Sequence, residues 1–397
     1  MLSVAEAQKM ILSEIVPIGR ERVPLALSLG RILAEEIISK IDDPPWDRSA
    51  MDGFAVCSED TQSASDSNPA VLTVIEAVPA GAMPEKMVTK GTASKVMTGA
   101  PIPKGADAVV KIEDVQASHD QTITLTHFVP AEDFIRPRGG VIHEGELLLK
   151  PGIPIRPYEI ALMAAIGVSS VFVSKRPIVA VLSTGDELAD IHEDRKPHQI
   201  YNSNGYALAA QVSESGGVPL FLGIAKDNRE DLTAKLKKAS EADFILLSGG
   251  VSVGDYDIVK EVLVMKFWKV AMKPGKPLAF GRFSGKIAFG LPGNPVSAMV
   301  TFNQFVRPAL LLSQGSRNLF LPVVQAKLMA KIEKEEGRCH FVRGRLVLAD
   351  GEYQVTPTGD QDSSNIVSLV AANALIVIAT ETGDVEAGAT VWVQVLS

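Results

Sequence analysis

A glycine-rich turn between an apolar run and two acids is the stretch of this sequence best suited to chemistry. Residues 244–257 read FILLSGGVSVGDYD. The apolar run is typical of a buried parallel strand, and glycines at its end let backbone N–H groups converge on a phosphate or another oxyanion. An acid beside an anion is repulsive unless a cation lies between them, so Asp255 or Asp257 indicates Mg²⁺. An ordinary strand-to-helix turn with a solvated acid is the alternative.

Lysines that follow this stretch supply the opposite charge. Residues 267–277 read FWKVAMKPGKP. In an extended chain Lys269 and Lys273 share one face, about 7 Å apart. Lysines on a mostly apolar segment are costly to bury unless an anion pairs with them. Lys276, in the following turn, can bind the same anion. The alternative is a half-exposed edge strand with its lysines outside. Taken with the acids, the lysines indicate a phosphorylated ligand and hard divalent cations.

Alternating strand and helix patterns predict the elements that position these groups. Residues 177–315 alternate between apolar runs and amphipathic segments, which predicts a mainly parallel sheet with helices on both faces. Ligands bind such sheets at the carboxyl ends of the strands. The turns expected at that edge carry Asp186, Glu187, Asp227, Gly249, Gly250, Asp257, Gly293 and Asn294.

The flanking regions have other patterns. Residues 3–16 predict a helix that begins at a capping box of Ser3 and Glu6, and residues 71–130 read as strands. Asp52 lies on an irregular segment broken by two prolines, and a rigid proline- and glycine-containing turn presents Thr98. Short strands over residues 321–397 predict a small β sandwich or barrel.

Composition and missing motifs exclude several classes of protein. The 397 residues suffice for two to four domains, and a net charge of −8 disfavours nucleic acid as a partner. Two distant cysteines fit a reducing compartment. We find no signal peptide or membrane span, so a cytoplasmic protein without a membrane partner is expected. Walker A, GxGxxG and HExxH motifs are absent from the sequence.

Six collinear motifs carry a family resemblance that spans essentially the whole chain. They are DDPPWDRSAMDGFAV, VMTGAPIPKGADAVV, VLSTGDEL, SGGVSVGDYD, KPGKPLAFG and GLPGNPVSA. In this order and spacing they resemble the molybdopterin molybdenumtransferase family, the bacterial MoeA group, to which the gephyrin E domain is similar. The resemblance implies an enzyme that inserts molybdate into adenylylated molybdopterin with Mg²⁺ present and releases AMP.

The resemblance also implies an elongated homodimer of multidomain α/β plus β chains. The implied domains are an elongated N-terminal domain (1–43 and 137–172), an inserted β-rich domain (44–136), an α/β molybdopterin-binding domain (173–318) and a C-terminal β domain (319–397). The active cleft is expected to join the α/β domain of one subunit to the inserted region of the other. Partners implied are molybdopterin adenylyltransferase and the molybdoenzymes or carriers that receive the cofactor.

Site residues follow from the same resemblance. The residues implied as catalytic are Asp52, Thr98, Glu187, Asp227, Asp257, Lys269 and Lys273. Those implied to bind substrate or cofactor are Ser183, Thr184, Gly185, Asp186, Ser248, Gly249, Gly250, Gly254, Lys276, Pro292, Gly293, Asn294, Pro295, Arg343 and Ser363. We expect Glu187, Asp227 and Asp257 to hold Mg²⁺ at the pyrophosphate end, with Asp52 and Thr98 near the pterin or the metal.

Two positions depart from the family pattern. Val141 replaces an acid in the RxRGxD turn, and Asp362 replaces glycine in the loop that commonly reads GxQGS. A carboxylate where ligand phosphates should bind weakens the role of Ser363 and points to altered kinetics or a shifted substrate. The alternative to an enzyme is a scaffold that keeps the fold without turnover, but retention of the acids and both lysines favours the enzyme.

Overall fold

The computed structural model describes residues 1–117, 121–250 and 263–396. The chain divides into two compact units, one of Met1–Glu35, Pro151–Pro157 and Ser170–Ser397, the other of Glu36–Lys150 and Tyr158–Ser169. This division is coarser than the four domains expected from the sequence, so their boundaries stay a prediction. Within the described ranges, no helix has both the length and the apolar character that crossing a membrane requires.

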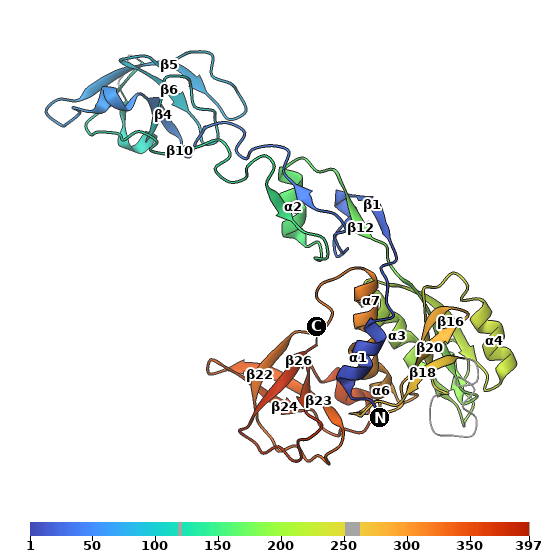
Figure 1. The fold of residues 1–397 in the computed structure, drawn as a ribbon. Coiled ribbons are helices and arrows are strands. Elements are labelled where there is room, and N and C mark those ends of the chain that lie inside the picture. The colour runs from blue at the N-terminus through green and yellow to red at the C-terminus, as the bar shows by residue number, and fades with distance from the viewer. Residues whose placement is uncertain (118–120, 251–262, 397) are drawn as a thin grey trace. The chain divides into compact units, whose positions relative to one another are not determined.

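A six-stranded sheet forms the centre of the first unit within the described residues (Figure 1). Its strands are β13 (Ile178–Thr184), β16 (Val218–Ala225), β17 (Phe244–Ser248), β18 (Val264–Trp268), β20 (Ala279–Phe283) and β21 (Lys286–Leu291). They lie in the order β16-β13-β17-β21-β20-β18. The first four strands in this order are mutually parallel. Strand β20 pairs antiparallel with β21, and β18 pairs antiparallel with β20. The mainly parallel sheet expected from the strand–helix alternation is confirmed.

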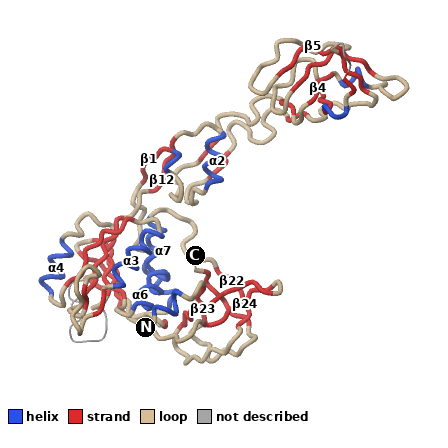
Figure 2. Tube along the Cα trace, turned by 180° about the vertical axis from the view of Figure 1, so that it is seen from behind, coloured by secondary structure: helices blue, strands red, loops and turns tan. Residues whose placement is uncertain are grey.

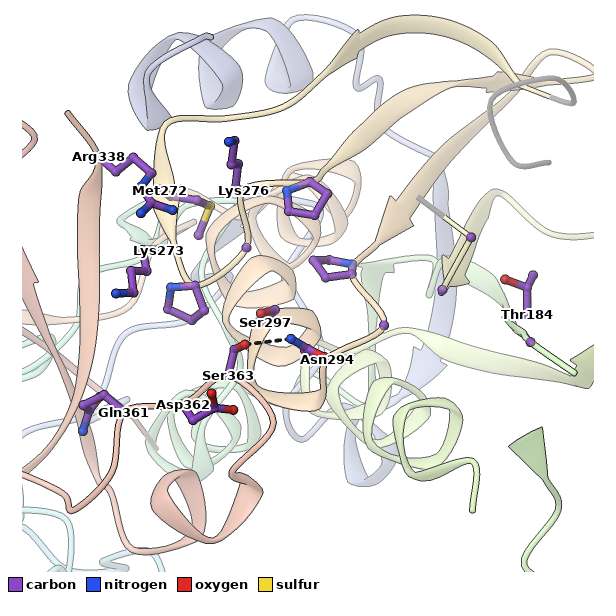
Figure 3. Close-up of a pocket in the computed structure, with 18 of the residues that line it drawn as sticks. Thr184, Met272, Lys273, Lys276, Asn294, Ser297, Arg338, Gln361, Asp362 and Ser363 are labelled. Carbon is purple, nitrogen blue, oxygen red and sulfur yellow. Dashed lines mark hydrogen bonds between the residues drawn. The ribbon is translucent and has the colours of Figure 1, made fainter. Parts of the chain in front are cut away.

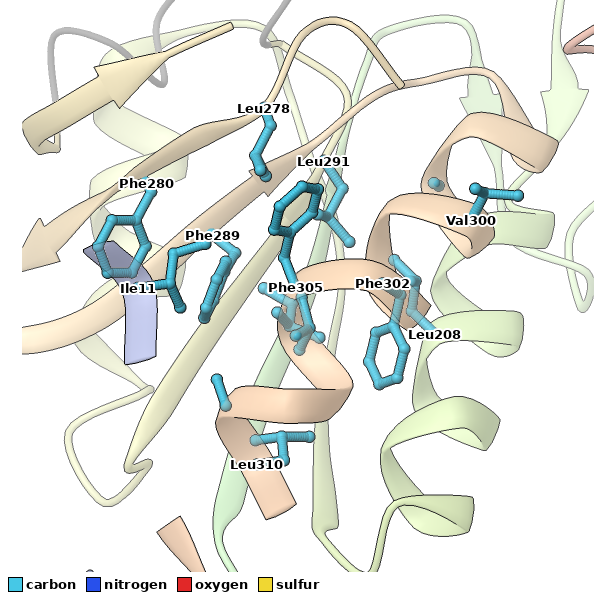
Figure 4. Close-up of a cluster of buried hydrophobic side chains, with 14 of the residues drawn as sticks. Ile11, Leu208, Leu278, Phe280, Phe289, Leu291, Val300, Phe302, Phe305 and Leu310 are labelled. Carbon is cyan, nitrogen blue, oxygen red and sulfur yellow. The ribbon is translucent and has the colours of Figure 1, made fainter. Parts of the chain in front are cut away.

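Helices cover both faces of this sheet (Figure 2). They are α1 (Val4–Leu12), α3 (Ser203–Glu214), α4 (Arg229–Lys237), α6 (Pro295–Thr301), the π-helical η4 (Phe302–Val306) and α7 (Arg307–Ser313). Alternate residues of each strand point to opposite faces, so Leu246 of β17 lies in the buried cluster that α3, α6 and α7 contribute to. Leu208 of α3, Val300 of α6 and Leu310 of α7 belong to this cluster (Figure 4). Leu247, the neighbour of Leu246, packs against α4 on the other face.

The N-terminal helix belongs to the first of these cores. Ser3 and Glu6 form the expected capping box at the start of α1. Ala7 and Ile11 are fully buried in the cluster of β17, β21 and α7. Burial of a side chain such as Ile11 contributes about 1.5–3 kcal/mol to stability. Residues 1–35 therefore fall in the same compact unit as the α/β sheet. The elongated N-terminal domain that the family resemblance implies, residues 1–43 and 137–172, stays a prediction.

A closed barrel follows the α/β region in the first unit. Its strands are β22 (Val323–Leu328), β23 (Cys339–Ala349), β24 (Glu352–Pro357), β25 (Ala374–Ile378) and β26 (Thr390–Val395), with β19 (Met272–Lys273) added at its edge and α8 (Ile366–Val370) between β24 and β25. Strands β23, β24, β22, β26 and β25 pair in that order, and β25 pairs with β23 to close the ring. Of the sandwich and the barrel left open by the sequence, the structure has the barrel.

The pairing of β19 with β23 joins the α/β region to the barrel. Met272 lies opposite Cys339, and Lys273 lies opposite His340. The segment before it turns out of the sheet at Lys269, whose φ of +111° interrupts the extended chain. The chain is therefore not continuously extended from Lys269 to Lys273 as predicted, because β18 belongs to the α/β sheet and β19 to the barrel.

The second unit has its own sheet, in the order β7-β4-β6-β5-β9-β8. Its strands are β4 (Gly53–Val56), β5 (Ala70–Val78), β6 (Thr92–Val96), β7 (Ala108–Lys111), β8 (Gln116–Ala117) and β9 (Thr122–Leu125). Smaller elements of the chain are β1 (Arg20–Pro24), η1 (Leu25–Leu27), β2 (Ile37–Ile38), β3 (Arg48–Ser49), η2 (Ser58–Thr61), η3 (Ile112–Asp114), β10 (Ile135–Arg136), β11 (Leu147–Leu149), α2 (Pro157–Ala165), β12 (Ser170–Ser174), β14 (Leu188–Ala189) and β15 (Ile200–Tyr201). The core of this sheet buries Val56, Leu72 and Leu125, as expected for strands with one apolar face.

Candidate active site

A cavity of about 800 Å³ lies in the first unit, where β13, β17 and β21 end (Figure 3). Thr184, Gly249 and Pro292 stand at those three strand ends and line it. This is the edge at which open α/β sheets bind ligands. The expected site residues that line this cavity are Thr184, Gly185, Glu187, Asp227, Gly249, Gly250, Lys273, Lys276, Pro292, Gly293, Asn294 and Ser363.

One side of the cavity is cationic. Lys273, Lys276 and Arg338 line it, and none of the three is ion-paired within the described chain. The tight turn between the lysines needs Gly275, which has a φ of +103°. A Cβ there would collide with the buried hydroxyl of Thr301. The turn and the β19–β23 pairing therefore set three positive charges side by side, a suitable surface for an oxyanion.

A buried histidine lies next to this cationic side of the cavity and has a lowered pKa. His340 is 6% exposed and lies opposite Lys273 in the β19–β23 register. Burial, followed by the charges of Lys273, Lys334 and Arg338, lowers the pKa of His340 from 6.5 to about 4. The ring is therefore neutral at pH 7, and the local positive charge comes from the lysines and the arginine.

Carboxylates occupy the turns after β13 and β16. The backbone N–H of Asp186 donates to Asp227 Oδ2, and the N–H of Asp227 donates to Asp186 Oδ1, both at 3.3 Å. Glu187 folds back over Gly185, where a Cβ would collide with its carboxylate. Glu187 and Asp227 line the cavity, so the turns bring together the acids that the sequence predicted at this edge. Asp257 and Gly254 lie outside the described residues.

A loop of the barrel closes the cavity opposite the strand ends. Asn294 Nδ2 donates to Ser363 Oγ at 2.7 Å (Figure 3), and the N–H of Val296 donates to the carbonyl of Ser363. Asp362 also lines the cavity, but its Oδ1 accepts from the N–H of Ser364 at 2.7 Å and from the Ser364 hydroxyl. These bonds lower the pKa of Asp362, with the Ser364 hydroxyl as the largest cause.

Arg343 supports that loop from behind. Its side chain is 1% exposed and does not reach the cavity within the described structure. Its guanidinium donates to the carbonyls of Asp360 at 3.3 Å and Asp362 at 2.9 Å, and its Nε donates to Ser368 Oγ at 3.1 Å. Burial lowers the pKa of Arg343, and the nearby acids partly offset this. The geometry gives Arg343 a positioning role, where the sequence suggested direct ligand contact.

Other expected residues lie beside the cavity. Ser183, Ser248 and Pro295 line a neighbouring cavity of about 380 Å³. Lys269 points its Nζ at the Trp268 ring, 3.9 Å from the ring centroid, which is a cation–π geometry. Lys269 and Lys273 therefore do not form the pair on one strand face that alternation predicted.

Sequence reasoning missed residues that reach the cavity through tertiary pairing. Arg338 and Ser297 line it, together with Asp360 and Gln361 of the barrel loop. A Gly337–Arg338 pair just before a strand was the available signal for Arg338. Without the β19–β23 pairing, nothing in the sequence connects Arg338 to Lys273.

In the second unit, the structure pairs Asp52 with Thr98. Asp52 Oδ1 accepts from the Thr98 N–H at 2.6 Å and from its Oγ1 at 2.8 Å. These bonds, led by the backbone N–H, lower the pKa of Asp52. Gly53 fits beneath this turn because a Cβ would collide with the Val110 carbonyl. The two residues named together from the sequence are thus neighbours.

Family models cover most of the chain. The MoeA N-terminal region (domain I and II) matches residues 2–167, the "Probable molybdopterin binding domain" matches 180–311, and the MoeA C-terminal region (domain IV) matches 325–396. A molybdopterin molybdenumtransferase of Nostoc sp. is 38% identical over 90% of this chain and 84% of its own length. One of Haemophilus influenzae is 36% identical over 99% and 98%.

The chain belongs to the MoeA family. The crystal structure of a molybdopterin biosynthesis MoeA protein from Pyrococcus horikoshii has the same fold, with a TM-score of 0.89, 33% sequence identity and complete coverage of both chains. The family resemblance read from the six motifs is therefore confirmed.

Val141, where this MoeA family member departs from the family pattern, lies in a turn that is held by hydrogen bonds to two other acids. Arg138, in the same turn, donates its backbone N–H to Asp47 Oδ1 at 2.7 Å and its Nε to Asp42 Oδ2 at 2.6 Å. The pKa of Asp42 is lowered by the Glu144 N–H first and by Arg138 second. Val141 is 62% exposed, so Asp42 and Asp47 hold the turn without an acid at that position.

Proposed function

We propose that this chain inserts molybdate into adenylylated molybdopterin, with Mg²⁺ present, and releases AMP. The observation that carries the proposal is one cavity with cations and carboxylates on different walls. Lys273 and Arg338 stand on one wall, and Glu187 and Asp227 follow the strand ends on another. Relatives named molybdopterin molybdenumtransferase that align with nearly the full chain support the same activity.

The cationic side suits molybdate, a tetrahedral dianion. Lysine ammonium groups offer three donors each, and the guanidinium of Arg338 offers a planar fork. Because these cations have no carboxylate partner in the described structure, an oxyanion can bind them without first breaking a salt bridge. The Ser297 hydroxyl lies in the same lining and can donate to a further oxygen.

The reaction also requires hydrolysis of the phosphoanhydride bond between AMP and the molybdopterin phosphate, in which a water oxygen bonds one phosphorus as the other phosphate leaves. Negative charge then develops on the departing phosphate. Preorganised cations that stabilise such charge contribute on the order of 10²–10³ in rate for a single donor. Lys276, exposed at the Pro-Gly-Lys-Pro turn, is placed to supply this stabilisation. Gly249 and Gly250, both with positive φ, bring the backbone close to the same space.

The acidic turns suit Mg²⁺. The atoms that these turns offer to a metal ion are carboxylate and backbone oxygens. The reciprocal hydrogen bonds between Asp186 and Asp227 fix two carboxylates beside Glu187. Mg²⁺ keeps several waters and needs few protein ligands. Within the described residues no cluster of three acids, histidines or cysteines has metal-binding geometry, and Asp257 lies outside them. Bound Mg²⁺ would neutralise and polarise the phosphate oxygens.

AMP release in vitro tests the function. The purified chain is incubated with adenylylated molybdopterin, Mg²⁺ and molybdate, and AMP is measured with and without molybdate. We expect molybdate-dependent AMP release together with cofactor that activates a molybdenum-requiring apoenzyme. Binding of adenylylated molybdopterin without AMP release under any of these conditions would contradict the proposal and favour a scaffold that has kept the fold without turnover.

Assembly and partners are further proposals that rest on the family. We propose a homodimer that receives its substrate from a molybdopterin adenylyltransferase and passes the product to molybdoenzymes or carriers. Light scattering of the purified chain measures the assembly directly. A mass near 42.3 kDa, that of one chain, at all concentrations would exclude the dimer.

A further inference from the structure

The strand pair of β1 and β12 presents two faces that differ in charge (Figure 1). Side chains alternate along a strand, so Arg20 and Arg22 lie on one face of β1 and Glu21 lies on the other. Glu21 is ion-paired with Arg31. Arg20 and Arg22 are exposed, and neither forms an ion pair within the described residues. The arginine face of β1 therefore carries charge that nothing in the described chain neutralises.

Contacts with β12 hold both arginines in place. The guanidinium carbon of Arg20 lies 4.6 Å from the centroid of the Phe172 ring, and that of Arg22 lies 5.6 Å from it, which are cation–π distances. Arg22 also donates its Nε to Ser170 Oγ at 2.8 Å. Glu35 accepts from the Phe172 N–H at 2.7 Å and pairs with neither arginine in the described structure. A guanidinium stacked on a ring keeps N–H groups for a carboxylate, and less side-chain entropy is lost when an acid binds.

A cavity of about 430 Å³ lies next to β1 and is lined by Arg20 and Arg317. The described lining contains no acid. The stem of Arg317 rests on Gly152, where a Cβ would lie 2.9 Å from the Arg317 Cγ. The rest of the lining is largely apolar and includes Pro17 and Leu33. The cavity is therefore suited to a side chain with an apolar stem and an acidic end.

The outer edge of β1 is open in the described structure. There, β1 pairs with β12 in a sheet of two strands and takes part in no isolated bridge. An open edge offers backbone N–H and C=O groups to an added strand. A second copy of β1 is a poor candidate for that strand, because antiparallel pairing about Glu21 would set arginine opposite arginine and glutamate opposite glutamate. The edge therefore favours a strand of opposite charge.

We propose that β1 docks an extended acidic segment of a partner protein, whose carboxylates at alternate positions pair with Arg20 and Arg22. Alternate side chains of any extended chain are about 7 Å apart, so the two spacings match. The net charge of −8 disfavours a nucleic acid as the occupant, and the backbone groups of an open edge recognise a peptide. A further acidic side chain of the segment enters the cavity toward Arg317. This surface lies outside the first cavity, of about 800 Å³, and its neighbour, so the inference goes beyond the proposed function.

Glutamine variants remove the charge and keep most of the side chain. Arg20→Gln and Arg22→Gln each retain a stem that covers Phe172. Arg345→Gln removes the same charge from an exposed position on strand β23, outside this surface, and is the matched control. The probe is a short labelled peptide that alternates glutamate with threonine, and its counterpart with glutamine in place of glutamate is the control peptide. Binding to the full chain is measured by fluorescence anisotropy at low and at high salt.

We expect the glutamate peptide to bind saturably and the glutamine peptide not to bind. Affinity should fall about fivefold with Arg20→Gln and with Arg22→Gln, stay unchanged with Arg345→Gln, and fall with added salt. Bound peptide should also slow amide hydrogen exchange in residues 20–24, as an added strand requires. AMP release by the three variants should stay at the wild-type rate, because β1 lies outside the candidate active site.

Three results would overturn the proposal. They are no binding of the glutamate peptide, binding that neither Arg20→Gln nor Arg22→Gln weakens, and binding that leaves hydrogen exchange in residues 20–24 unchanged. An oligothymidylate that binds more tightly than the peptide and is weakened by the same two variants would overturn it as well, because the occupant would then be a nucleic acid. None of these results depends on AMP release, so the docking surface and the proposed function fail separately.

Discussion

The two charged sides of the first cavity are built in opposite ways. The carboxylates of Asp186 and Asp227 are held by each other's backbone N–H groups, so their positions are fixed by short turns after neighbouring strands. The cations come from β19, its turn and the residue before β23, and have no partner in the described chain. Local hydrogen bonds therefore fix the acidic side, and long-range strand pairing fixes the basic side.

This difference indicates which side of the cavity has charges that lack a partner until a ligand binds. Burial is the largest cause of the low pKa of His340, and the charges of Lys273, Lys334 and Arg338 lower it further. A set of unpaired cations this close together is electrostatically unfavourable in the free protein. An anion relieves that repulsion, whereas the acidic turns are already satisfied by N–H donors. We therefore expect substitutions on the basic side to act mainly through molybdate, and those on the acidic side mainly through Mg²⁺.

Lys273→Ala is the substitution with the largest expected effect. Loss of one charge from the basic side should lower molybdate-dependent AMP release roughly 100-fold, chiefly by raising the KM for molybdate. Lys273 is exposed, so the folded structure should persist. AMP release is titrated with molybdate for wild type, for this variant and for Lys237→Ala, which changes an exposed lysine of α4. Equal molybdate dependence in all three proteins would break the comparison.

Asp227→Asn tests the acidic side. The amide keeps an oxygen that can accept from the Asp186 N–H but removes the charge that favours a divalent cation. We expect the Mg²⁺ concentration for half-maximal AMP release to rise about tenfold or more, with the molybdate KM little changed. Glu230→Gln, at an exposed position in the first turn of α4, is the control. A shift in molybdate KM without a shift in Mg²⁺ dependence would reverse the assigned roles.

The acidic side could be predicted from the sequence because its residues follow apolar runs directly. Asp186, Asp227 and Gly249 each come within a few residues of a strand end, and parallel strands share one carboxyl edge. The same reasoning predicted the α/β sheet, its helices on both faces and the β character of the C-terminal region. Local periodicity thus suffices where neighbours in the sequence are also neighbours in the structure.

The basic side could not be predicted in full, for the complementary reason. Arg338 reaches Lys273 only through the pairing of β19 with β23, two segments more than 60 residues apart in the chain. Alternation misplaced Lys269, because a positive φ turns the chain between two sheets. Arg343 was read as a ligand contact, since its burial behind the barrel loop depends on packing that no local pattern records.

The pH dependence of stability tests the surroundings of His340, where burial and then the neighbouring cations disfavour a charged ring. His340 has a folded-state pKa of about 4 against an ordinary 6.5, so the unfolded chain binds more protons between these values. The free energy of unfolding should therefore fall as pH drops from about 6.5 to about 4, by up to roughly 3 kcal/mol from this group. Urea unfolding of wild type and His340→Gln over this range measures it, and the variant should lose less stability.

Sulfate sharpens the same experiment. An oxyanion bound near Lys273 and Arg338 offsets their charge, so it should raise the pKa of His340 measured by NMR titration. The Lys273→Ala variant should show a higher His340 pKa without sulfate and a smaller response to it, because Lys273 is the largest charge contributor to the shift. A His340 pKa that is the same in both proteins would show that the basic side carries less charge than its geometry indicates.

The smallest expected effect concerns Asp362, the one acid on the barrel loop that departs from the family pattern. Its carboxylate lines the cavity and interacts with Arg343, but its Oδ1 is turned to the Ser364 N–H and hydroxyl. Because solvent screens exposed charges, we expect Asp362→Gly to lower the molybdate KM by only a few-fold. Asp362→Asn keeps an oxygen for the Ser364 N–H and removes the charge alone. If both variants lower KM equally, the charge is responsible. If Asp362→Gly lowers the molybdate KM and Asp362→Asn does not, the conformation of the barrel loop is responsible. The shape of this loop then affects molybdate binding more than the charge of residue 362 does.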